Sequence, residues 1–225
     1  VIIRAHDQHY VYNERAQGVV GRQTLTSGQR SPYVQAEGLL PGHYLAEVTI
    51  GGGQRTEPDT YTGLLVPSAA VIRDASGADV TSEYTFDGNS YVAADLTIHK
   101  KGNGKPDGNG GEQPMEIYAQ NQNFVYNGQP QGTFGVNLSV NATNPLATAI
   151  ELLPGHRLTN VTLTGTQRTV PGTYGDAITP TGVRIVNAAN QDVTGKYLIT
   201  ADSYFKGDLT IHKKGNGKPD GNGGE

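Results

Sequence analysis

The chain of 225 residues has no cysteine and no tryptophan. The lack of cysteine excludes disulfide bonds, thiolate metal sites and thiol nucleophiles. No apolar run approaches the roughly 20 residues that span a bilayer. The first residues, VIIRAHD, lack the basic and then apolar pattern of a secretion signal. We therefore expect a soluble segment that does not insert into a membrane, and any export signal would lie outside it.

An excess of positive charge is also missing. Lys and Arg number 17 and Asp and Glu 21, which gives a net charge of −4 at pH 7. Proteins that bind nucleic acids usually collect phosphates with a basic patch, and here both signs of charge are scattered along the chain. We therefore do not expect a nucleic acid as a partner.

What the chain has instead is an internal repeat, which decides its organisation. The same displacement of 113 residues relates several segments of the two halves. The run DLTIHKKGNGKPDGNGGE at 95–112 recurs unchanged at 208–225, LLPGH at 39–43 aligns with 152–156, and DVT at 79–81 aligns with 192–194. The chain is therefore two copies of one module.

Each copy ends in GNGKPDGNGGE, a polar, glycine-rich tract with no apolar residue to anchor it. This composition is typical of a flexible linker. We predict a first β-sandwich repeat at 1–101, a linker at 102–114, a second repeat at 115–214 and a linker remnant at 215–225. Because the second tract ends the chain, we expect a monomeric piece of a longer array.

Short segments rich in Val, Ile, Thr and Tyr are separated by turn residues about every 8 to 12 positions, the spacing of a β-sandwich or barrel. Within these segments, apolar residues at alternate positions are predicted to point into a core. The inward pairs are Leu96 and Ile98, Leu209 and Ile211, Val48 and Ile50, Val161 and Leu163, Ala70 and Ile72, and Val183 and Ile185. The predicted fold is mainly β, with two tandem Ig-like β-sandwich modules.

Two local signals add detail to this fold. Ser31-Pro32 and Asn144-Pro145 each place a helix-capping residue before a proline suited to a first helical turn. We therefore allow for one short helix in each module, and a helix there would also suit a β-grasp arrangement, the alternative fold. Asn127-Gly128, which follows the apolar run FVY, predicts a hairpin.

Together, several motifs carry a family resemblance. They are YNG near the start of copy two, LPGHxL followed by VTxxGxQ, GTY, and IxxAxxxDVTxxY leading into LTI. In these motifs the chain resembles the Ig-like or MBG-type tandem repeat domains of large Gram-positive (Firmicutes) cell-surface proteins that are adhesin-like. Copy one departs from the pattern at Glu14, which replaces the glycine of YNG.

The resemblance implies a structural stalk or adhesive repeat, extracellular and attached to the bacterial cell wall, without catalytic activity. Two alternatives stay open. One is a lectin-like adhesin module that binds a host glycan or a matrix protein, and the other is an accessory module of an extracellular enzyme.

Most histidines have a simple structural interpretation. His6 and His9 lie three residues apart, so on a strand they point to opposite faces, which argues against chelation. On the last strand of each copy, His99 and His212 are expected to face solvent. We therefore predict no metal site at these histidines.

Other candidate chemistry is also absent. His43 and His156 occupy the Pro-Gly-His turn of both copies, where we expect a structural role. Asp107 and Glu112 in the glycine-rich tract do not have the spacing of a calcium-binding EF-hand loop. No GxSxG elbow or recurring Ser, His and Asp set is present. We predict no catalytic residue and no cofactor.

Sugar binding depends on aromatic side chains, and the chain has 12 tyrosines. Most of them recur in both copies and are expected to pack at the edge of the core. Tyr33 and Tyr44 occur only in copy one, opposite Leu146 and Arg157. We therefore name Tyr33 and Tyr44 as candidate ligand-binding residues.

Overall fold

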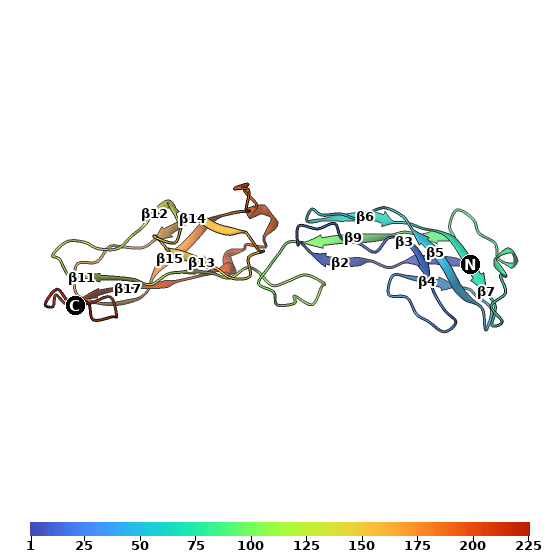
Figure 1. The fold of residues 1–225 in the computed structure, drawn as a ribbon, viewed down its shortest axis with the longest axis horizontal. Helices are drawn as coiled ribbons and strands as arrows, with labels where there is room; N and C mark the ends of the chain where they lie inside the picture. The colour runs from blue at the N-terminus through green and yellow to red at the C-terminus, as the bar shows by residue number, and fades with distance from the viewer. The chain divides into compact units, whose positions relative to one another are not determined.

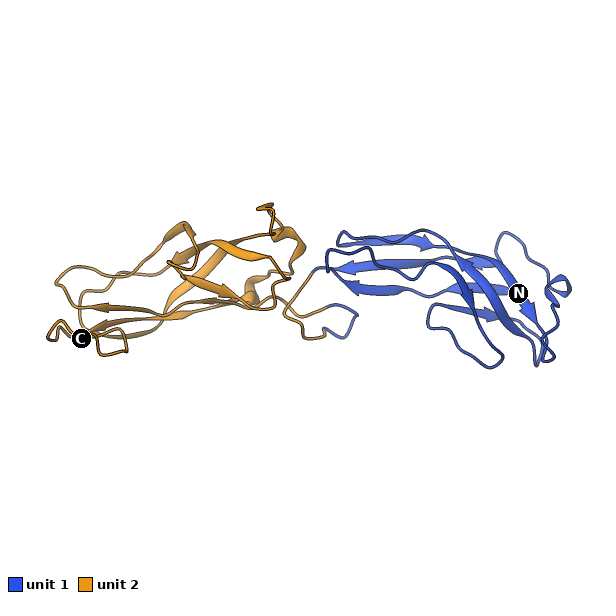
Figure 2. Cartoon of the chain, viewed as in Figure 1, with its two compact units in different colours: residues 1–100, 107–111 blue, residues 101–106, 112–225 orange.

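The structure, a computed structural model, describes residues 1–225. They divide into two compact units, which we describe separately (Figure 2). Unit 1 contains residues 1–100 and 107–111, and unit 2 contains residues 101–106 and 112–225. No helix in the chain is both long enough and apolar enough to cross a membrane.

Unit 1 consists of nine strands and one turn of 3-10 helix (Figure 1). In chain order they are β1 (Ile2–Ala5), β2 (Gln8–Val11), β3 (Gly21–Thr24), β4 (Val34–Glu37), β5 (Tyr44–Ile50), β6 (Asp59–Leu65), β7 (Pro67–Arg73), η1 (Thr81–Glu83), β8 (Tyr91–Val92) and β9 (Ala94–His99). They form three sheets in the orders β4-β1-β8, β2-β9-β6 and β3-β5-β7. The first sheet packs on the third through contacts of β1 and β8 with β7.

Unit 2 repeats this arrangement with one continuous strand in place of two. Its elements are β10 (Ile117–Ala119), β11 (Gln122–Val125), β12 (Gly135–Ser139), β13 (Ala147–Ala149), β14 (Arg157–Thr164), β15 (Gly172–Val186), η2 (Thr194–Lys196), η3 (Ala201–Ser203), β16 (Tyr204–Phe205) and β17 (Gly207–His212). β15 joins the counterparts of β6 and β7, so one sheet has five strands in the order β11-β17-β15-β14-β12. A second sheet, β13-β10-β16, packs on β15 and β14. Two packed sheets of strands confirm the mainly-β, sandwich-like fold.

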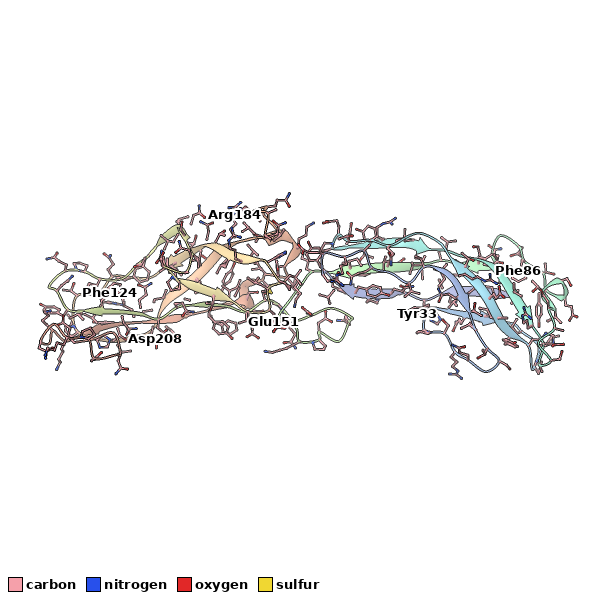
Figure 3. The ribbon with its side chains drawn as sticks, in the orientation of Figure 1. Tyr33, Phe86, Phe124, Glu151, Arg184 and Asp208 are labelled. Atoms are coloured by element: carbon pink, nitrogen blue, oxygen red, sulfur yellow. The ribbon has the colours of Figure 1, made fainter.

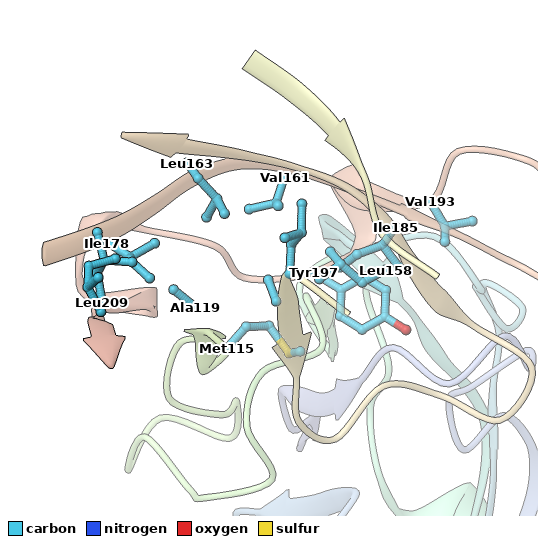
Figure 4. Close-up of a cluster of buried hydrophobic side chains, with 13 residues drawn as sticks. Met115, Ala119, Leu158, Val161, Leu163, Ile178, Ile185, Val193, Tyr197 and Leu209 are labelled. Carbon is cyan, nitrogen blue, oxygen red and sulfur yellow. The ribbon is translucent and has the colours of Figure 1, made fainter. Parts of the chain in front are cut away.

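The core of unit 2 forms where the inward faces of these two sheets meet (Figure 4). Leu209 and Ile211 of β17 are fully buried, as the alternation of apolar and polar residues predicted. Four of the other predicted inward pairs are also buried in the two units, namely Leu96 and Ile98, Val48 and Ile50, Val161 and Leu163, and Ala70 and Ile72. The pair Val183 and Ile185 differs, since Val183 is only half-buried while Ile185 and its neighbour Val186 are both buried. The register of β15 against β14 shifts next to Val183, which changes the alternation there.

The structure corrects the expectation of a short helix in each module. The segments after Ser31-Pro32 and Asn144-Pro145 form strands β4 and β13, which pair antiparallel with β1 and β10. Ser31 acts in a turn, where its hydroxyl accepts a hydrogen bond from the Tyr33 N–H. Pairing with the edge of a sheet satisfies the backbone of these segments better than a single helical turn could. The β-grasp alternative loses its crossing helix with this correction.

The predicted hairpin at Asn127-Gly128 is also wrong. A tight turn is present, since the Asn127 side chain accepts a hydrogen bond from the Gln129 N–H and Gly128 has a positive φ of 80°. The strand before it, β11, pairs in parallel with β17 and not with the strand that follows the turn. The turn therefore redirects the chain without joining two paired strands.

The glycine-rich tract predicted as a linker at 102–114 is a hydrogen-bonded loop. Glu112 accepts hydrogen bonds from Lys101 Nζ at 2.9 Å and from the Gly102 N–H at 2.8 Å. Near the tip of the loop, the Asp107 carboxylate accepts from the N–H groups of Asn109 and Gly111. Its residues are divided between the two units and do not form a separate segment. The turn chemistry of Asp and Gly organises the tract without any apolar anchor.

The second tract, predicted as a remnant at 215–225, has the same internal structure. Lys214 Nζ lies 2.7 Å from Glu225 Oε1, and the Gly215 N–H donates to the same carboxylate. Asp220 accepts from the N–H groups of Asn222 and Gly224. All of these bonds lie within unit 2.

Candidate functional site

Unit 1 has an open groove beside strand β4 that contains one of the two candidate tyrosines. Its volume is about 560 Å³. The walls come from the middle of β4, the beginning of β5, and the loop before β4. Polar side chains are common in its lining, namely His6, Gln29, Arg30, Gln35, His43 and Tyr44. A concave surface with convergent polar groups and one aromatic ring is able to hold a small polar ligand.

Unit 2 has a groove of about 480 Å³ at the corresponding place, beside β13 and the beginning of β14. The repeat places His156 and Arg157 where unit 1 has His43 and Tyr44. The rest of its lining is mostly apolar, with Val140, Ala142, Pro145, Ala147, Leu152 and Leu158. The groove is therefore a property of the module, whereas its chemistry differs between the two copies.

The structure does not bring Tyr33 and Tyr44 into one site. Tyr44 lines the groove, and Tyr33, labelled in Figure 3, does not. Tyr33 lies near Tyr10 of β2. Burial, and then the Tyr33 hydroxyl, raise the pKa of Tyr10. Both candidate tyrosines are half-buried. The alignment of the repeats identified them as specific to copy one, but it could not show that Tyr33 lies before β4 and Tyr44 begins β5, in a different sheet.

The histidines of the Pro-Gly-His turns hold the lip of each groove. The Tyr84 hydroxyl lies 2.9 Å from His43 Nδ1 and accepts a hydrogen bond from the Leu40 N–H. In unit 2 the Tyr197 hydroxyl lies 2.7 Å from His156 Nδ1. The hydroxyl in each unit links the turn to the segment that follows the 3-10 helix η1 or η2. These contacts place both histidines in structural positions.

A second feature common to both units is the pairing of the first strands with the last. In unit 1, β2 runs parallel to β9, with Gln8 opposite Leu96 and Val11 opposite His99. The ladder continues past the strand, where the Tyr12 N–H donates to the His99 carbonyl at 2.8 Å. On the other sheet, β1 runs parallel to β8.

Unit 2 has the same parallel ladder at the same place. β11 pairs with β17 over four positions, from Gln122 opposite Leu209 to Val125 opposite His212. The Tyr126 N–H donates to the His212 carbonyl at 2.8 Å, and β10 runs parallel to β16. In each unit the first two strands therefore pair in parallel with the last two, the second strand with the last.

Few titratable groups gather outside these features. No group of three or more His, Cys, Asp or Glu side chains is arranged to hold a metal ion. The pKa of Glu116 is lowered to about 2, first by a hydrogen bond from Lys105 and then by one from Tyr118. The side chain of Glu116 is bound to these partners and does not face a groove. Its role is to hold the beginning of the glycine-rich tract on unit 2.

Comparison of the chain with protein-family models, with curated protein sequences and with solved structures finds no match.

Proposed function

We propose that each unit is a non-catalytic, load-bearing repeat, and that the chain serves as a stalk or adhesive segment of an extracellular protein on a bacterial cell wall. The parallel pairing of the second strand (β2 or β11) with the last (β9 or β17) in both units carries the proposal. The cell-surface location rests on the resemblance of the repeat motifs to surface adhesin-like domains.

The mechanical argument follows from strand direction. Tension along the chain pulls the early strand of a unit toward its own beginning and the last strand toward its own end. Because the two strands are parallel neighbours, this tension shears the ladder, and its hydrogen bonds must break together and not one at a time. Each hydrogen bond adds only about 1 kcal/mol to the net free energy of unfolding. The barrier to forced unfolding depends on all the hydrogen bonds of the ladder, because they break in one step.

The test is to pull the whole chain from its two ends in a single-molecule force experiment. The variant Tyr126→Pro removes the N–H that donates to His212, and Tyr126→Ala removes the same ring but keeps the N–H. We expect Tyr126→Pro, and not Tyr126→Ala, to lower the unfolding force of one of the two units.

A matched control separates mechanical from thermodynamic effects. Ile150→Pro removes the backbone hydrogen bond from the Ile150 N–H to the Glu116 carbonyl, which lies outside the β11–β17 ladder. The Ile150 side chain is about as exposed as that of Tyr126. We expect the two proline variants to lose similar free energy of unfolding in denaturant, while only Tyr126→Pro weakens the unit under force. Equal loss of force in both variants would contradict a load-bearing ladder.

The groove of unit 1 favours one alternative, a lectin-like module that binds a glycan or a host protein. The repeat keeps the groove but changes its lining, and Tyr44 offers a ring on which a sugar could stack. On a glycan and matrix-protein array, this alternative requires binding that Tyr44→Ala abolishes. Tyr33→Ala is the matched control. Because Tyr33 lies outside the groove, this variant should bind as the unchanged chain does.

A further inference from the structure

We propose that His9 and His99 form a binding site for a divalent transition metal, with Cu²⁺ preferred, on the outer face of unit 1. His9 Nδ1 and His99 Nε2 lie 3.0 Å apart on neighbouring strands, although 90 residues separate them in the sequence. The rings stack with their centroids 5.3 Å apart and their planes at 29°. The structure places two imidazole nitrogens, good ligands for such metals, side by side at the surface.

The separation of the two nitrogens favours one coordination geometry. Two metal–nitrogen bonds of about 2.0–2.1 Å that span 3.0 Å meet at roughly 90–97°. Square-planar and tetragonal sites have ligands at such an angle, and they suit Cu²⁺, whereas tetrahedral sites for Zn²⁺ need a wider one. The order of affinities among divalent metals also favours Cu²⁺ over Zn²⁺.

The surroundings of the pair are also suited to a metal ligand. The Asp107 carboxylate lies close to the His99 ring, and the two groups attract each other. A Cβ atom added to Gly111 would lie 2.8 Å from Asp107 Oδ2 and 2.9 Å from His99 Nδ1. A carboxylate on the far side of a ligating imidazole can orient the ring. His9 is exposed to solvent, so a hydrated ion can reach the pair.

Glycines make this arrangement possible. A side chain added to Gly110 would begin 2.5 Å from the His9 Cβ, and one added to Gly111 would begin 2.8 Å from the Asp107 carboxylate. Any other residue would push the tip of the loop away from the histidines. The glycine-rich tract therefore holds Asp107 beside His99.

Unit 2 provides a natural control. Asn123 takes the place of His9, and its Oδ1 lies 3.1 Å from His212 Nε2. Asp220 and the glycines of the second tract repeat the rest of the arrangement. With one imidazole in place of two, unit 2 should not hold the ion, so we expect one site per chain.

The test is titration of the whole chain with Cu²⁺ alone, followed by calorimetry, by electron paramagnetic resonance for bound imidazole nitrogens, and by line broadening of amide signals in NMR. We expect one Cu²⁺ per chain, two coordinated imidazoles, and broadening centred on β2 and β9. His9→Asn, which copies unit 2, should weaken binding more than about 10-fold, the least that loss even of an outer-shell partner costs. His6→Asn should have no effect, because His6 lies in the groove.

A gain-of-site variant makes the proposal independent of any folding defect. Asn123→His should add a second equivalent of Cu²⁺ in unit 2, since Asn123 already faces His212. The proposal is overturned if His9→Asn binds Cu²⁺ as the unchanged chain does, if broadening centres on His6 or on the amino terminus, or if Asn123→His adds no site. Binding of Zn²⁺ as tight as that of Cu²⁺ would overturn the choice of metal.

Discussion

The two units agree in their backbone and differ in their surfaces. Both join the second strand to the last in a parallel ladder, and both close the glycine-rich tract with a lysine–glutamate pair. The grooves beside β4 and β13 keep their position but not their lining, and His9 in one unit stands where Asn123 stands in the other. The shared parts include the parallel ladder on which the proposed load-bearing role rests, and the parts that differ are the groove lining and the histidine pair.

The sheets β4-β1-β8 and β13-β10-β16 also share their strand pairing but differ in their surface side chains. At one register position, unit 1 places Arg4 opposite Val92, and Arg4 forms an exposed ion pair with Glu37. At the corresponding position of unit 2, Tyr118 and Phe205 stack with their centroids 4.6 Å apart. Two different chemistries therefore support the same pairing, so the pairing is decided by the core beneath it.

The largest effect is expected when an equivalent core residue is truncated in each unit. Leu96 and Leu209 are both fully buried on the last strand. Leu96→Ala and Leu209→Ala should each cost about 2–5 kcal/mol of unfolding free energy. Denaturant unfolding followed by NMR signals from each unit should show loss of stability only in the altered unit. Loss of stability in both units from one substitution would mean that the chain does not unfold as two independent modules.

Truncation of an exposed side chain provides the control for this prediction. Val136 in unit 2 is 82% exposed. Val136→Ala should change stability by less than about 0.5 kcal/mol.

A smaller effect should distinguish the tyrosines that hold the groove lips. Tyr197 is 2% exposed, and Tyr84 is only half-buried. Tyr197→Phe removes the buried hydroxyl that accepts a hydrogen bond from the Leu153 N–H and lies beside His156 Nδ1, and should cost about 1–3 kcal/mol. Tyr84→Phe should cost clearly less, because water can reach Leu40 and His43. Chemical denaturation of the two variants measures the difference. Equal costs would show that the greater burial of Tyr197 does not make its hydroxyl more important for stability than that of Tyr84.

The sequence predicted the core well because strand alternation is a local pattern. Leu96, Ile98, Leu209 and Ile211 needed only the period of two to be placed inside. The strand at β4 was missed because its capping residue and proline resemble a helix start, and only the free edge of β1 decides otherwise. Local signals therefore gave the class of fold but not the partner of each strand.

The candidate sites depend on such partners, so the sequence predicted less of them. The sequence places His9 near His6, whereas the structure brings its side chain to His99, which lies diagonally across the parallel ladder from it. Parallel pairing of β2 with β9 leaves no mark in either segment alone. The difference between His9 and Asn123 in aligned repeats was the one available signal, and it becomes meaningful only once β9 lies beside β2.

The smallest effect concerns pH and unit 2 alone. A hydrogen bond from Lys105 and then one from Tyr118 lower the pKa of Glu116 from 4.5 to about 2. A carboxylate whose pKa is lower in the folded state adds stability above pH 4.5, and this stability is lost as the pH falls toward 2. Unit 1 has Ile2 at the aligned position, so it lacks this contribution.

Glu116→Gln tests this contribution directly. The variant should be less stable than the unchanged chain at pH 7, and the two stabilities should converge as the pH falls from 4.5 toward 2. Stability of unit 2, measured by denaturation at several pH values, gives the result, while unit 1 serves as the internal reference. A constant gap between the two chains across this range would mean that Glu116 keeps an ordinary pKa, and that the tract is held on unit 2 by its backbone bonds and not by charge.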